Sequence, residues 1–245
     1  MQRSSTVDSS RLTAPASNRD KKIPSYLEKA YWWAYLHPRA VRFFERQWLV
    51  NLILWGNFNI LRDAVLEKLG HSIDGKTLQV ACVYGDFTPR LAQQLMPGAT
   101  LDVIDVAPVQ LDNTHNKLGN HGQVKLHQQD SSKMDFQDGE FDNTVVFFLL
   151  HEQPETVRLA TIAEAIRVTA KGGRIVFVDY HLPSIWNPMR YLMKGVFKLL
   201  EPYAENFWSK DIENWAKLDR QQAGIKKRLF FGGLYQMTSI DLHAS

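Results

Sequence analysis

Histidine and carboxylate side chains follow two apolar segments of this sequence. His151 and Glu152 come at the end of the apolar run within residues 141–150, and Asp179 and His181 come at the end of a second run. If these ends meet, the four side chains could bind a divalent metal, because imidazole and carboxylate ligands together suit Mn, Fe or Zn. They could equally act as general acid and base near neutral pH. The plainer alternative is that Glu152 caps the next helix and the histidines are partly solvated.

A second set of polar residues has the order expected of a nucleoside site. Gly85 lies between a predicted strand and a predicted helix, where backbone N–H groups would face a ligand. Asp105 follows the next strand, about 20 residues later, and could accept both ribose hydroxyls. Asp130, with Ser131 beside it, could accept from an adenine amino group after the third strand. Each is also explained by a turn or a helix cap, but the ordered series is more specific than any member.

The elements that must position these residues alternate along the chain. Extended apolar segments and amphipathic helical segments take turns, which indicates a parallel, doubly wound α/β sheet. We predict strands at residues 77–83, 101–105, 125–129, 141–150 and 174–179, and helices at 88–95, 108–118, 154–169 and 212–223. Residues 227–231 and 233–239 are predicted to close one edge of the sheet as an antiparallel pair. In such sheets ligands bind beyond the carboxyl ends of the strands.

The chain divides into a polar tail, an aromatic helical segment and an α/β domain. Residues 1–22 are rich in Ser and Thr and are predicted to be disordered. Residues 23–75 form a helical lid segment, and residues 76–245 form the α/β domain with a helical insertion at about 182–208. Both helical segments place Arg or Lys between aromatic residues. This pattern fits a lid over an apolar ligand and contact with a membrane surface, although plain packing explains it equally well.

Composition limits the remaining function classes. The chain has 245 residues and a net charge of +3, which is too low to indicate nucleic-acid binding without a clustered basic patch. A single cysteine, Cys82, excludes an intramolecular disulfide framework. No apolar segment approaches the roughly 20 residues of a membrane-spanning helix, and no secretory signal is recognisable. We therefore expect a cytoplasmic protein at the surface of the inner membrane; the oligomeric state stays open.

From Lys76 to Ser239 the sequence resembles class I S-adenosylmethionine (SAM)-dependent methyltransferases, especially those of ubiquinone and menaquinone biosynthesis. The residues that carry the resemblance are Asp105, Asp130, Phe141-Asp142, Leu150-His151-Glu152, Lys171-Gly172-Gly173-Arg174 and Phe230-Phe231-Gly232-Gly233-Leu234-Tyr235. Two segments are similar, more narrowly, to the rhodoquinone-biosynthesis methyltransferase-like family. These are Val83-Tyr84-Gly85-Asp86-Phe87 and Tyr31-Trp32-Trp33-Ala34-Tyr35-Leu36-His37-Pro38.

The superfamily resemblance implies a Rossmann-like fold with a mostly parallel seven-stranded sheet and helices on both faces. The narrower resemblance implies conversion of ubiquinone to rhodoquinone, in which an amino group replaces one ring methoxy group. It also implies SAM as the amino donor and Mn²⁺ as an assisting metal. We expect cofactor contacts from Gln79, Val83, Tyr84, Gly85, Asp105, Val106, Asp130, Ser131 and Phe148. We expect catalytic roles for Tyr84, His151 and His181, and metal ligation by His151, Glu152, Asp179 and His181.

Residues 79–85, which we call the cofactor loop, follow the superfamily pattern only in part, and the differences suggest this change of chemistry. Gln79 stands where an acid normally stabilises the ammonium of the methionine part, and Ala81 and Val83 replace two glycines. Loss of a nearby negative charge disfavours the protonated amine, and an amine must be unprotonated to attack a quinone carbon. The side chains of Val83 and Tyr84 would also occupy space in which the methionine end of SAM usually binds. Our hypothesis is that the amine, rather than the methyl group, is directed at the quinone.

Two other functions stay open on the sequence. An ordinary quinone or phenol methyltransferase would need a base such as His151 or His181 and no metal. A non-catalytic SAM- or quinone-binding accessory protein is supported by the altered loop and opposed by the many polar residues at the strand ends.

Overall fold

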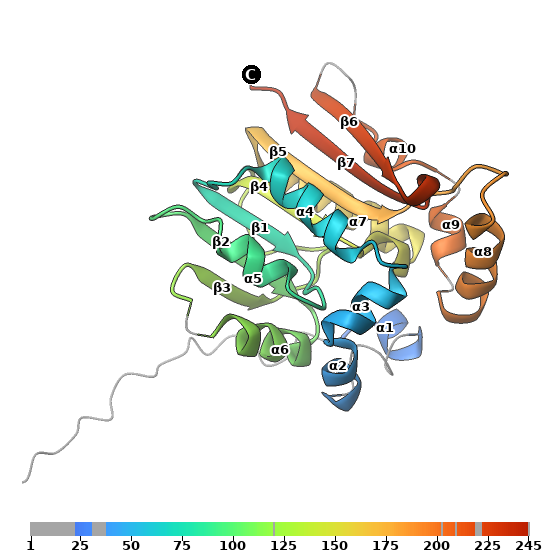
Figure 1. Ribbon diagram of the computed structural model, residues 1–245. Helices are drawn as coiled ribbons and strands as arrows, with labels where there is room; N and C mark the ends of the chain where they lie inside the picture. The colour runs from blue at the N-terminus through green and yellow to red at the C-terminus, as the bar shows by residue number, and fades with distance from the viewer. Residues whose placement is uncertain are drawn as a thin grey trace, which may run out of the picture.

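The computed structural model describes residues 23–30, 38–119, 121–201, 203–208, 210–218 and 222–244. They form a single seven-stranded sheet in the order β3-β2-β1-β4-β5-β7-β6 (Figure 1). The strands are β1 (Lys76–Val80), β2 (Thr100–Asp105), β3 (Val124–Gln128), β4 (Phe141–Phe147), β5 (Thr169–Tyr180), β6 (Ala223–Phe230) and β7 (Tyr235–Leu242). β1 to β5 are parallel, and β7 pairs antiparallel with both β5 and β6. The predicted Rossmann-like fold class is thus confirmed.

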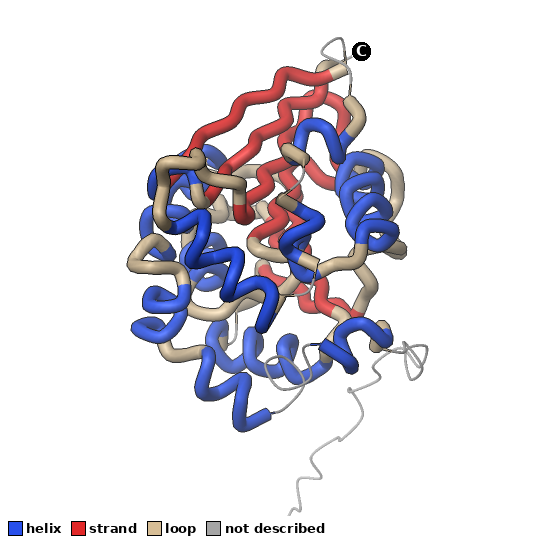
Figure 2. The backbone as a smooth tube through the Cα atoms, turned by 90° about the vertical axis from the view of Figure 1, so that its right-hand side faces the viewer, coloured by secondary structure: helices blue, strands red, loops and turns tan. Residues whose placement is uncertain are grey.

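Helices cover both faces of the sheet (Figure 2). The helices are α1 (Ser25–Ala30), α2 (Pro38–Phe44), α3 (Gln47–Ile53), α4 (Phe58–Leu69), α5 (Phe87–Ala92), α6 (Pro108–Leu118), α7 (Glu155–Val168), α8 (Met189–Leu200), α9 (Ala204–Phe207) and α10 (Ile212–Ala216). The 3₁₀ turns η2 (Leu150–Glu152) and η3 (Phe231–Gly233) complete the described elements. α4 and α5 lie in front of the sheet in Figure 1, and α7 lies behind it.

The core consists of the apolar strands and the helix faces that pack on them. Leu78, Val145 and Phe177 of the central strands are fully buried, as expected where a parallel sheet is covered on both sides. Leu61 of α4 is also fully buried, so this helix is part of the core although it lies within the predicted lid segment. A lid role stays a prediction, now for α1 to α3 of this segment.

Several element boundaries differ from the prediction. The helix expected over 212–223 ends at Ala216, and Lys217 follows in a left-handed conformation with φ of 52°. β5 begins at Thr169 rather than at residue 174: Thr169 pairs with Phe141 of β4, and a register shift, with Gly172 at a φ of 80°, precedes the pairing of Arg174 with Asn143. The tail of residues 1–22 and the aromatic residues 31–37 lie outside the described part of the chain.

Candidate cofactor and substrate site

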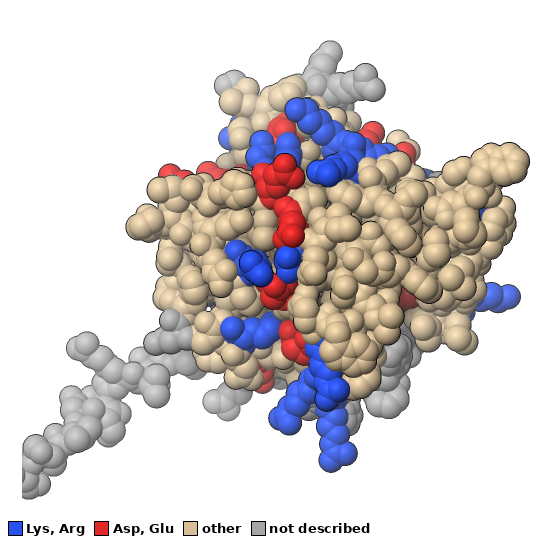
Figure 3. All heavy atoms as spheres, in the orientation of Figure 1, with Lys and Arg blue, Asp and Glu red and all other residues tan. Residues whose placement is uncertain are grey.

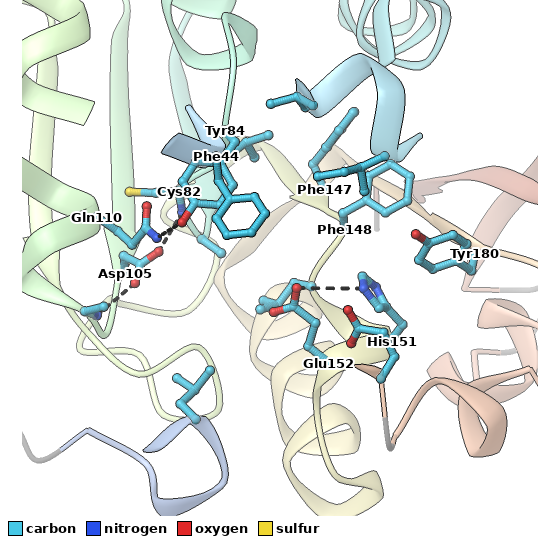
Figure 4. Close-up of a pocket in the computed structure, with 18 of the residues that line it drawn as sticks. Phe44, Cys82, Tyr84, Asp105, Gln110, Phe147, Phe148, His151, Glu152 and Tyr180 are labelled. Carbon is cyan, nitrogen blue, oxygen red and sulfur yellow. Dashed lines mark hydrogen bonds and ion pairs between the residues drawn. The ribbon is translucent and has the colours of Figure 1, made fainter. Parts of the chain in front are cut away.

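A cavity of about 440 Å³ lies at the carboxyl ends of the central strands (Figure 4). Its wall combines the chain segments that follow β1, β2 and β4 with side chains from α1, α3 and α8. Most of the wall is apolar or aromatic, and its polar groups are few. Such walls are typical of sites that enclose a small molecule and orient it by a few polar contacts.

Most of the predicted cofactor residues lie in this wall. Val83, Tyr84, Asp105, Val106, Asp130, Ser131 and Phe148 line the cavity, together with His151 and Glu152. Gln79 and Gly85 do not line it. The side chain of Gln79 bonds the loop backbone at Ala81, and Gly85 bonds Glu45 through its own backbone N–H.

Asp105, at the end of β2, supports the loop from below. One carboxylate oxygen accepts from the backbone N–H of Cys82 and the other from that of Ala107, each at 2.8 Å. Burial raises the pKa of Asp105 to about 6, although these backbone N–H groups act to lower it. The carboxylate is ionised at neutral pH and faces the cavity, as a ribose-binding acid must.

We predict that nucleoside binding weakens as the pH falls through about 6. Below the pKa of Asp105 the carboxylate is neutral and loses acceptor strength, so affinity should fall about tenfold per pH unit. Titration calorimetry with S-adenosylhomocysteine between pH 5 and pH 8 measures this, with the ligand's own groups outside the range. The Asp105→Asn protein, whose side chain does not titrate, should bind weakly and show no step at this pH. A step that persists in that variant would assign the titration to another group.

Backbone strain concentrates in the cavity wall. Trp55, Ala81 and Phe148 have φ angles of 51°, 71° and 54°, although none is glycine. A left-handed conformation costs such residues roughly 1–2 kcal/mol each, and this kind of strain clusters at ligand sites. Gln79 helps to hold the strained turn, since its buried amide nitrogen donates to the carbonyl of Ala81 at 2.9 Å. Gln79 thus shapes the loop instead of facing the cavity.

The lid segment holds the same loop through charged side chains. Glu45, between α2 and α3, accepts from the backbone N–H of Gly85 at 3.0 Å and pairs with Lys117 at 3.1 Å. Lys117 in turn donates to the carbonyls of Val83 and Gly85. A β-carbon at Gly85 would lie 2.8 Å from the Gln47 side chain and 3.0 Å from that of Phe58, so the position requires glycine.

Tyr84 crosses the space beside the loop. Its hydroxyl accepts from the amide of Gln110 at 2.8 Å, and its ring packs against Phe44 with centroids 6.1 Å apart. Burial raises the pKa of Tyr84, so its phenol is protonated at neutral pH. The side chain can donate a proton or a hydrogen bond but cannot serve as a phenolate base there.

The predicted adenine end is built from short-range polar contacts. Asp130 accepts from the backbone N–H and the hydroxyl of Ser132, while Ser131 receives a hydrogen bond from the Gln153 amide at 3.0 Å. Tyr26 of α1 enters the wall from the lid side, and burial together with the charges of Asp130 and Glu152 raises its pKa. α1 therefore closes the cavity with a protonated phenol next to two carboxylates.

At the other end of the cavity a buried aspartate orients a histidine. Asp179, on β5, accepts from the backbone N–H groups of Leu150 and Tyr180 and lies 2.7 Å from Nδ1 of His151. Burial alone would lower the pKa of His151, but the Asp179 carboxylate raises it to about 9. Because Nδ1 is bonded to Asp179, Nε2 is the atom of His151 that faces other groups.

Those other groups are carboxylates. Nε2 of His151 lies 3.8 Å from Oε1 of Glu152, and Glu201 at the end of α8 joins them. One donor atom from each of the three residues lies within 4.8 Å of the others, which is close enough for one metal ion. Metal-binding histidines usually bond their second ring nitrogen to a carboxylate, as His151 does to Asp179.

This arrangement corrects the predicted metal set. Asp179 is engaged with His151 and the backbone, so it supports the cluster instead of belonging to it. His181 is directed elsewhere: its Nδ1 lies 2.7 Å from the carbonyl of Gly233, and its Nε2 lies 3.4 Å from Asp211. The antiparallel pairing of β5 with β7 draws His181 toward the start of β7, because its backbone N–H donates to the carbonyl of Leu234.

Sequence reasoning did not identify Tyr26 and Glu201, which line the cavity, or Glu45, which bonds the loop beside it. Glu201 had a usable signal, because it ends an apolar helix that otherwise carries only basic charges. Tyr26 and Glu45 reach the site through the packing of the lid helices, which no local pattern reveals.

The comparisons with known proteins agree with this fold and cavity. Residues 77–173 match the model of a family described as "Methyltransferase domain". A demethylmenaquinone methyltransferase of Staphylococcus aureus is 27% identical over 173 residues, which are 70% of this chain and 70% of that protein. The matched domain contains β1 to β4, the cofactor loop and the segment of His151 and Glu152.

Solved structures extend the agreement to the whole architecture. An O-methyltransferase family protein from Burkholderia thailandensis has a TM-score of 0.64 at 11% identity, covering 93% of this chain and 66% of that one. The N-methyltransferase NodS of Bradyrhizobium japonicum, solved with S-adenosylhomocysteine, has a TM-score of 0.52 at 14% identity, covering 75% and 86%. The sheet order and the position of the loop after β1 agree with the family match, so the chain is similar to class I SAM-dependent methyltransferases over residues 77–173 and shares their fold.

Proposed function

We propose that this protein is a SAM-dependent transferase that replaces a methoxy group of ubiquinone with an amino group taken from SAM. The observation that carries the proposal is the pairing of two features in one cavity. The cofactor loop, whose residues differ from the superfamily pattern, lies at one end of the cavity. The cluster of His151, Glu152 and Glu201 lies at the other end. The quinone as substrate class is supported by the similarity to demethylmenaquinone methyltransferases.

The loop supports amino transfer through its shape. Val83 lines the cavity where the superfamily pattern has a glycine, and the large side chain of Tyr84 lines it beside Val83. The backbone N–H of Gly85, the remaining glycine, donates a hydrogen bond to the side chain of Glu45. The methionine end of SAM therefore meets a different surface from the usual one, and the buried amide of Gln79 behind the loop contributes no negative charge to stabilise its ammonium. This favours a neutral amine that can add to the ring carbon bearing the methoxy group, after which methanol leaves. The quinone ring then takes two electrons and the proton from the methionine Cα to leave a C=N bond, and water hydrolyses that bond to the aminohydroquinone and the 2-oxo acid derived from SAM.

The cluster supports the assisting metal through its donor set. His151, Glu152 and Glu201 offer one imidazole nitrogen and two carboxylates, which suit Mn²⁺. A divalent ion there would supply Lewis-acid polarisation of a quinone carbonyl. The protein itself orients His151 through Asp179, so that Nε2 points toward the cavity. Phe147, Phe148 and Tyr180 line the cavity and would enclose the quinone ring.

Methyl transfer to a quinone or phenol is the second candidate, and the family match and the S. aureus relative favour it directly. In that case His151 would act as the base after losing its proton. The loop would still bind SAM, but methyl transfer does not explain its departure from the superfamily pattern or the cluster of Glu152 and Glu201 with His151.

One experiment separates these functions. Purified protein is incubated with Mn²⁺, a short-tail ubiquinone and SAM labelled with ¹⁵N on the amine and ¹³C on the methyl group, and the quinone is analysed by mass spectrometry. We expect ¹⁵N in the quinone, loss of one methoxy group as methanol, and no ¹³C. The same incubation with a demethylated quinone tests methyl acceptance. A ¹³C-methylated product would establish the second candidate, and SAM binding with neither label incorporated would favour an accessory protein.

A further inference from the structure

We propose that α3 and α8, which flank the opening of the cavity, form a docking face for an anionic lipid bilayer. The face consists of residues 43–55 and 185–200. The inference rests on the proposed function, because a long-tailed quinone resides in a bilayer and must enter the cavity from there. No helix among the described residues combines the length and apolar character needed to span a bilayer, so this contact would be peripheral.

The cavity wall is continuous with the exposed apolar surface. Leu52, Ile53 and Trp55 of the α3 segment and Leu200 of α8 line the cavity and are also exposed. A side chain with both properties marks an opening rather than an enclosed wall. The cavity therefore opens between α3 and α8 through apolar side chains, which an isoprenoid tail can cross without meeting a charge.

The outer surface of α8 extends this apolar path. Leu192, Val196 and Leu199 share one helix face by their spacing, and Val196 lines the cavity while Leu199 is 82% exposed. Trp186, just before the helix, is 87% exposed. Most of the exposed large hydrophobic side chains among the described residues lie within the docking face. On the surface of an ordinary soluble protein such side chains are usually scattered singly.

The charges around this opening select the partner. Arg42 and Arg46 are exposed beside α3, and Lys194 and Lys198 are exposed on α8. The only acid within the two segments, Glu45, is partly buried against the cofactor loop. On the face shown in Figure 3 the acidic side chains gather in a central stripe, while the area on the side of α8 has few charges. Apolar side chains flanked by cations are the pattern of interfacial helices on anionic lipid.

Vesicle sedimentation tests the proposal with the full chain. The protein is mixed with vesicles of phosphatidylcholine alone or with added phosphatidylglycerol, and the bound fraction is measured after centrifugation. We expect binding that increases with phosphatidylglycerol and weakens with salt. The Leu199→Asp variant should lower the partition coefficient by about tenfold. Leu229→Asp is the matched control, since Leu229 is 48% exposed on the edge strand β6, and it should bind as wild type.

The outcomes separate this proposal from the proposed function, because vesicle binding needs no turnover. Turnover of a water-soluble short-tail quinone should be equal in wild type and Leu199→Asp. Equal loss of binding in both aspartate variants, or binding to no vesicle, would overturn the docking face. A concentration-dependent dimer in ultracentrifugation that only Leu199→Asp disrupts would also overturn it, by assigning the face to a second copy of the chain.

Discussion

Replacement of Glu201 by glutamine is expected to weaken Mn²⁺ binding by about a hundredfold and to lower quinone turnover at least as much. The change removes one of the two carboxylate charges of the cluster, those of Glu152 and Glu201, and keeps the size of the side chain. The packing of α8 should therefore survive, because Met193 and Phe197 provide its buried contacts. Electron paramagnetic resonance of Mn²⁺ measures the affinity, and mass spectrometry of the labelled quinone measures turnover.

Glu205 supplies the matched control for this prediction. It lies exposed on α9, four residues further along the chain, and loses the same charge when changed to glutamine. We expect wild-type Mn²⁺ affinity and turnover in Glu205→Gln. If Glu201→Gln binds Mn²⁺ as tightly as wild type, Glu201 is no ligand, and the cluster would have to act as an acid–base group.

Replacement of Arg158 by alanine is expected to lower the free energy of unfolding by about 3–5 kcal/mol. Arg158 of α7 is fully buried and donates to the carbonyls of Leu150, Gln153 and Tyr203. Its guanidinium also packs on the ring of Trp215 at 4.9 Å. Alanine would leave these buried carbonyls without their donor, which costs more than the bonds contribute.

Urea denaturation followed by far-UV circular dichroism measures this loss. Arg158→Lys should be intermediate, because it keeps the charge but cannot reach several carbonyls at once. The control is Arg90→Ala: Arg90 pairs with Asp86 at a half-exposed position, where such pairs contribute less than about 1 kcal/mol. Similar midpoints for Arg158→Ala and Arg90→Ala would show that the buried network is dispensable.

The sequence predicts the sheet well for a physical reason. Parallel strands covered on both faces are apolar throughout, and the turns between them are marked by glycine and proline. Because the strand ends meet at one edge, the order of Asp105, Asp130 and His151 along the chain is enough to place all three around one cavity. The helix over residues 212–223 was wrong at its end, because Lys217 adopts a left-handed conformation that the sequence does not signal.

The histidine–carboxylate cluster shows what sequence spacing cannot determine. Asp179 and His181 lie at a strand end, as predicted, yet hydrogen bonding divides them. Asp179 bonds His151, and His181 bonds the carbonyl of Gly233 in η3, just before β7. Glu201 replaces them in the cluster through the packing of α8 over the cavity, which depends on tertiary contacts far apart in the sequence.

The hydrogen bond between Glu45 and Gly85 couples the segment of α2 and α3 thermodynamically to the cofactor loop. Glu45 belongs to the lid segment, yet it bonds the loop at Gly85 and bonds α6 through Asn113 and Lys117. A displaced lid breaks these bonds, so a ligand that stabilises the loop also stabilises the lid, and the reverse holds to the same extent. Linkage of this kind makes the two ligands bind cooperatively: when one is bound and the loop and α2–α3 segment are held together, the other binds at a smaller entropic cost.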